Sequence, residues 1–160
     1  MFDRWRRRRR RERIDPFGVG EPWRRFVQGA LQAQAHYHRA ASGVAPGPLR
    51  ERLDDIGRRI DQATQECWRV ARRGDGLADA VAALDESDTK VRLETMVIDA
   101  REQLARLEAG LAQAVDSAVE LSVRSAHAPD TTVAGDDMHR LEDEIATLRS
   151  AMDELSGPEA

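Results

Sequence analysis

The residues of this chain that could do chemistry are few: a single cysteine, four histidines and one short glycine segment. Cys67 lies in a row of apolar residues together with Ile60, Ala63 and Val70. A thiol in such a row packs as a small buried hydrophobe and is a poor nucleophile. We therefore interpret Cys67 as structural, and a lone cysteine excludes an internal disulfide and suits a reducing cytoplasm.

The histidines do not form a metal-binding pattern. His36 and His38 are two residues apart, so on a helix they point to different sides, whereas paired ligands on one helical face are three or four residues apart. His139 does share a face with Glu142 and Asp143, a combination typical of a solvated helix. We predict no metal.

The glycine segment and the polar residues do not predict catalysis. Gly18-Val19-Gly20 has no preceding strand and no third glycine, so it lacks the pattern of a phosphate-binding loop. No Ser-His-Asp or Cys-His arrangement can be assembled from the spacing. We expect a protein without catalytic residues, cofactor or small-molecule substrate. An enzyme with a site built from distant residues is the third alternative, and an unexplained bound ligand would favour it.

The strongest pattern is a seam of apolar residues that alternate at spacings of four and three over 88–124. This period of about 3.5 residues predicts a long helix with one face against a partner helix. Few β-branched and aromatic residues also favour an all-α chain. The seam comprises Leu93, Val97, Ala100, Leu104, Leu107, Leu111, Ala114, Ala118 and Leu121.

A second helix with the same spacing is predicted over 48–85, and its register continues through Gly74-Asp75-Gly76. These two helices of nearly equal length, joined at Glu86-Ser87, predict an antiparallel, coiled-coil-like helical hairpin. A shorter helix over 22–41, ended by Ser42-Gly43, should pack on the half of the hairpin far from the turn. The turn end would then be under-packed, which makes it a candidate for self-association or partner binding.

A further helix is expected at the C-terminus. Residues 125–137 contain Pro129, Gly135 and small polar residues, and predict a flexible linker. The helix over 138–156 is short enough to be marginal alone, so it should dock on the bundle or pair with another chain. We expect its apolar seam to mediate association: Met138, Leu141, Ile145, Leu148, Met152 and Leu155. The predicted organisation is thus a tail and connector (1–21), a helical bundle (22–124), a linker (125–137) and this helix (138–156).

The charge is segregated along the chain. Residues 1–14 carry eight arginines against Asp3 and Glu12, while the chain as a whole has a net charge of −4. Six consecutive arginines repel one another in a compact fold, so we predict a disordered tail. Phe2 and Trp5 beside Arg6, Arg7, Arg8, Arg9, Arg10 and Arg11 favour contact with an anionic membrane surface. The alternative is that this tail associates with nucleic acid, which an acidic body would oppose. A tail with no specific partner is the third interpretation.

Trp68 has two interpretations. It can be buried against the aromatic side of the first helix, or it can be exposed and form a partner-binding patch with Arg69, Arg72 and Arg73. We favour burial.

No secretion signal or apolar run of about 20 residues is apparent. The sequence therefore predicts a cytoplasmic, non-catalytic interaction or scaffold protein, at the membrane face if the tail meets lipid. Its expected partner is a protein or a second copy of itself in a homo-oligomer.

Overall fold

The structure, a computed structural model, describes residues 12–127 and 131–156, except for the side chains of 131–134 and 154–156. Helices account for all the regular structure in these ranges, so the predicted all-α class is confirmed. After a 3-10 turn at Pro16–Gly18, four helices follow and pack together: α1 (Trp23–Ser42), α2 (Pro48–Ala83), α3 (Asp88–His127) and α4 (Thr131–Ser156).

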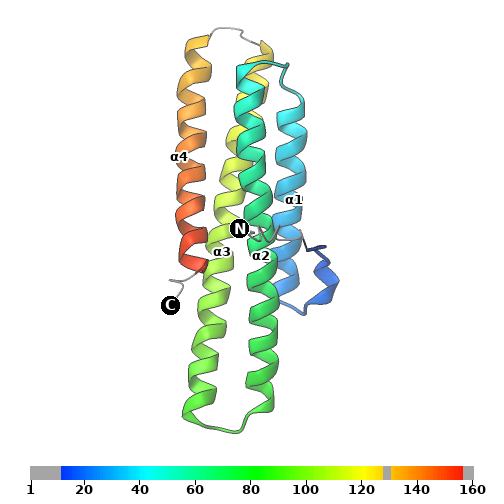
Figure 1. The fold of residues 1–160 in the computed structure, drawn as a ribbon, viewed down its shortest axis with the longest axis vertical. Helices are drawn as coiled ribbons and strands as arrows, with labels where there is room; N and C mark the ends of the chain where they lie inside the picture. Colours follow the sequence, from blue (N-terminus) through cyan, green and yellow to red (C-terminus); the bar gives the residue numbers. More distant parts are fainter. Residues whose placement is uncertain (1–11, 128–130, 157–160) are drawn as a thin grey trace, which may run out of the picture.

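The two longest helices form the axis of the molecule. In Figure 1, α2 and α3 run side by side in opposite directions and are joined at one end by the short turn of residues 84–87. Both α1 and α4 lie along the half of this pair that is far from the turn. The turn end therefore projects beyond the other helices as two helices only. We call this projecting part, residues 77–99, the tip.

Helix α2 is continuous through its two glycines, as the register of its seam predicted. Gly74 is buried, and a Cβ atom built on it would overlap the indole ring of Trp23 from α1. The missing side chain lets α1 and α2 approach closely at this point. Gly76 has no heavy atom within 4 Å of such a Cβ and faces solvent. The glycine pair thus reflects close packing at one position, and it does not stop the helix.

The segment predicted to be a linker is mostly helical. Helix α3 continues to His127 and α4 begins at Thr131, so the connection is reduced to 128–130, which lies outside the described residues. Asp137, which composition placed in the linker, is buried and accepts two hydrogen bonds from Arg124 at 2.8 and 3.0 Å. This contact between helices holds the first turns of α4 in place and overrides the local composition.

None of the helices, over the residues that the structure describes, combines the length and the apolar character needed to cross a bilayer.

Candidate functional site

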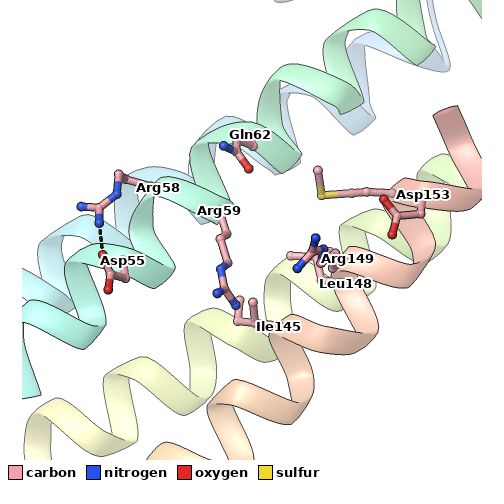
Figure 2. Close-up of a pocket in the computed structure, with 9 residues that line it drawn as sticks. Asp55, Arg58, Arg59, Gln62, Ile145, Leu148, Arg149 and Asp153 are labelled. Atoms are coloured by element: carbon pink, nitrogen blue, oxygen red, sulfur yellow. Dashed lines mark ion pairs between the residues drawn. The ribbon is translucent and has the colours of Figure 1, made fainter.

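A groove of about 540 Å³ lies between α2 and α4. Figure 2 shows Arg59 extending from α2 towards α4, with Arg149 on the opposite side of the space. Buried apolar residues of α4, Ile145 and Leu148, lie at its base. The remaining lining residues are Asp55, Arg58, Gln62, Met152 and Asp153.

The groove exists because α4 packs on α3 far more extensively than on α2. Gly110 of α3 accommodates the side chain of Leu148, which a Cβ at position 110 would approach to 3.1 Å. The seam that we had expected to associate with another chain is thus largely occupied within this chain. Met138, Leu141, Ile145 and Leu148 are buried, Met152 is half-buried, and the Leu155 side chain lies outside the described part.

Polar contacts fix α4 on α3 at its edges. Arg124 binds Asp137 as described above and also forms an ion pair with Glu120. Further along α4, Glu144 accepts a hydrogen bond of 2.9 Å from the hydroxyl of Ser117. These contacts set the position of α4, and so they also set the width of the groove.

The charges in the groove are not balanced locally. Arg58 forms an ion pair with Asp55 within α2, drawn as a dashed line in Figure 2. Arg59 and Arg149 have no ion-pair partner among the residues that the structure describes. Two unpaired guanidinium groups across one groove favour the binding of an anion, because each can donate several hydrogen bonds to one phosphate or carboxylate.

The N-terminal connector, residues 12–20, is fastened to α2. Its first described residue, Glu12, forms an ion pair with Arg72, and its carbonyl accepts a hydrogen bond of 3.1 Å from Gln65. At its other end, the N–H of Gly20 donates to Asp75 at 3.1 Å. The described part of the chain therefore begins at the outer face of α2. The predicted contact residues of the Arg-rich tail, Phe2, Trp5 and Arg6 to Arg11, lie outside the described residues.

Trp68 is only 5% exposed, so the interpretation of it as an exposed anchor is wrong and the favoured one, burial, is confirmed. The connector contributes to this burial, since Gly18 lies against the indole ring. The guanidinium of Arg72 lies 5.7 Å from the ring centroid on its outer side. Arg69 and Arg73 remain exposed, and Arg69 forms an ion pair with Glu66.

Cys67 is buried, with its Sγ 3.7 Å from the carbonyl oxygen of Phe26. Burial, together with the nearby carboxylate of Glu108, raises the pKa of this thiol to about 12. It is therefore protonated and inert at neutral pH, as expected of a structural cysteine.

On the surface, His38 and Gln34 of α1 both contact the carboxylate of Asp61 at 2.7 Å, which ties α1 to α2. No three His, Cys, Asp or Glu side chains of the described residues are placed to hold a metal ion.

The tip carries four exposed large apolar side chains, and the seam residues of α3 are less buried there than near the middle of the helix. Val91 and Ile98 are 55% and 53% exposed, and because they are seven residues apart they share one face of α3. Leu93 and Val97 of the seam, whose equivalents nearer the centre of α3 are fully buried, are only half-buried here. The other exposed apolar residues of the tip are Leu84 and Met96.

A second, shallower groove of about 560 Å³ lies between α1 and α3 at the opposite end of the molecule. Its exposed apolar residues are Val119 and Val123, bordered by His36 and Arg39 of α1. Val119 and Val123 are about one turn apart on the same helix as Val91 and Ile98 and are similarly exposed, so they offer a matched comparison for the tip.

The groove between α2 and α4 was not found from the sequence. Arg59 precedes the seam residue Ile60, and Arg149 follows the seam residue Leu148. Arginines that flank seams in this way border helix interfaces, and that signal could have identified them. The position of the groove depends on which helix α4 packs against. The apolar spacing of the sequence does not predict that packing.

Comparison with known proteins does not identify the chain: no protein-family model, curated protein or solved structure matches it.

Proposed function

We propose that this chain is a non-catalytic, cytoplasmic interaction protein that associates with a second copy of itself through the tip. In this proposal the α2/α3 pair packs as a coiled-coil-like hairpin, and the Arg-rich tail contacts anionic membrane. The observation that carries the proposal is the exposed apolar surface at the end of a projecting two-helix tip. A hairpin of two helices cannot enclose its own apolar residues, whereas four helices can.

The other half of the molecule supports this interpretation. There α1 and α4 cover the α2/α3 pair, and the seam residues Leu104, Leu107 and Leu111 are fully buried. Two tips packed against one another would supply the missing pair of helices. The docking of α4 within its own chain moves the proposed association surface from the seam of α4 to the tip.

Electrostatics gives the association a characteristic salt dependence. Residues 77–99 contain six carboxylates against Lys90 and Arg92, so two identical tips repel each other. Salt screens this repulsion with a Debye length of about 10 Å at 0.1 M and about 3 Å at 1 M. Self-association through the tip should therefore strengthen as salt is raised, whereas binding of a basic partner should weaken.

Sedimentation velocity over a range of concentrations and salt tests the proposal. In the full chain, Val91→Gln with Ile98→Gln should weaken dimerisation on the order of 100-fold, from about 0.8 kcal/mol for each of the four half-exposed apolar side chains of a dimer that no longer become fully buried. The matched control is Val119→Gln with Val123→Gln on the same helix, where the exposed fractions are 43% and 54%.

The outcomes separate the surfaces. Dimerisation that is lost in the tip variant and kept in the control supports the proposal. Loss in the control alone would place the interface in the groove between α1 and α3. A chain that stays monomeric at every concentration and salt would refute self-association.

A further inference from the structure

The outer face of α2 carries arginines and glutamines at helical spacing along the middle of the bundle. Arg58, Gln62, Gln65, Arg69 and Arg72 are three or four positions apart and therefore share one face. Arg58, Arg69 and Arg72 on this face are exposed, and Arg73 lies beside them without an ion-pair partner among the described residues. The unpaired Arg59 and Arg149 border the same face at the groove between α2 and α4.

The N-terminal connector contacts this face as well. Glu12, the first described residue, is held at this surface by Gln65 and Arg72. In Figure 1, α2 runs between α4 on one side and α1 with the connector on the other. Glu12 and the groove between α2 and α4 therefore both adjoin α2. Asp55, Glu66 and Glu12 on this surface are each paired with one arginine, and Asp153 is a further carboxylate that lines the groove.

We infer that this surface, which we call the α2 face (Arg58, Arg59, Arg69, Arg72 and Arg73 of α2 with Arg149 of α4), binds the phosphate groups of an anionic membrane, with Arg59 and Arg149 receiving a lipid headgroup in the groove. The inference rests on the proposed membrane contact of the tail and adds an orientation to it: the bundle lies with α2 against the bilayer. Its long axis is then parallel to the surface, and the tip is free to meet a second copy alongside.

Aromatic residues favour a membrane over other polyanions. Phe17 of the connector is 72% exposed, with the guanidinium of Arg24 5.4 Å from its ring centroid. Phe2 and Trp5 stand at the start of the tail. Aromatic rings partition into the headgroup region while arginines bind phosphates there, so the combination suits a bilayer surface. A duplex surface has no equivalent apolar layer for a ring to enter.

The test is flotation of the full chain with vesicles of phosphatidylcholine containing about 30 mol% phosphatidylserine, at ~0.1 M salt, where screening acts over about 10 Å. The groove variant, Arg59→Gln with Arg149→Gln, should lower the partition coefficient about 30-fold, from about 1 kcal/mol for each arginine near an anionic surface. The matched control is Arg101→Gln with Arg106→Gln on α3. Both control residues are exposed and have no ion-pair partner among the described residues, so the change in net charge is the same.

The control should change partitioning no more than about 3-fold, because a distant charge acts only through the screened field. Equal losses in the two variants, with wild-type binding intact and removed by Arg6 to Arg11→Gln, would overturn the orientation and leave the tail contact standing. No binding of the wild-type chain would overturn the tail contact and the orientation together. If the groove variant lost binding to a short DNA duplex but kept vesicle binding, the surface would be assigned to nucleic acid and the membrane inference would fail.

Discussion

Replacement of Gly74 by alanine should destabilise the bundle even though alanine is the better helix former. In a helix interior, replacing glycine by alanine normally raises the free energy of unfolding by about 1 kcal/mol. Here the new Cβ would overlap the ring of Trp23, which is 1% exposed and cannot move into solvent. Overpacking of this kind costs about 1–3 kcal/mol. The net result should be a free energy of unfolding lower by about 1 kcal/mol, which in a chain of this size lowers Tm by about 2–4 °C.

The matched control is Gly76→Ala in the same helix. A Cβ at position 76 meets no heavy atom within 4 Å, so this variant should gain about 0.5–1 kcal/mol. Urea denaturation followed by circular dichroism measures both variants against the wild-type chain. The free energy of unfolding should fall in Gly74→Ala and rise in Gly76→Ala. If both replacements stabilised the protein equally, Trp23 would not pack on Gly74, and the placement of α1 on α2 would be wrong.

Three further predictions concern the core. Tyr37→Phe should lower the free energy of unfolding by about 1 kcal/mol, because the buried hydroxyl donates a 3.0 Å hydrogen bond to the carbonyl of Leu53; an unchanged urea midpoint would contradict this. Leu141→Ala should cost about 2–5 kcal/mol and should accelerate hydrogen exchange in α4 more than in α1; equal acceleration in both helices would argue against separate docking of α4. Burial raises the pKa of Cys67 from 9.0 to about 12, so the folded state holds this proton more tightly than the unfolded state. Stability should fall as pH rises from about 9 towards 12, and less steeply in Cys67→Ala; an identical slope would show that the thiol is not the group responsible.

The apolar spacing of the sequence was sufficient to predict an all-helical chain whose four helices pack together. It also predicted that α2 continues across Gly74, because the register was kept on both sides. The reason for the glycine was not predictable in the same way. It depends on Trp23, which is far away in the chain and reaches this position only when α1 packs on α2.

Composition misled where contacts between helices decide the structure. The small polar residues of 125–137 are common in linkers, yet the ion pair between exposed Arg124 and buried Asp137 stabilises helix across much of this range. The burial of the Trp68 side chain depends on the connector, because Gly18 packs against the indole ring. The groove between α2 and α4 could not be predicted, because it depends on α4 packing mainly on α3. The apolar seams of α2 and α3 are too similar in sequence to show which of them α4 will contact.

The central claim, that two copies meet at the tip, is tested most directly by cross-linking through single added cysteines. Ile98→Cys and Val123→Cys place thiols at sites on α3 that are 53% and 54% exposed, while the native Cys67 stays buried and protonated. Under mild oxidation at micromolar concentration and high salt, Ile98→Cys should form a covalent dimer and Val123→Cys should not. Equal cross-linking of the two variants, or none in Ile98→Cys, would contradict association through the tip.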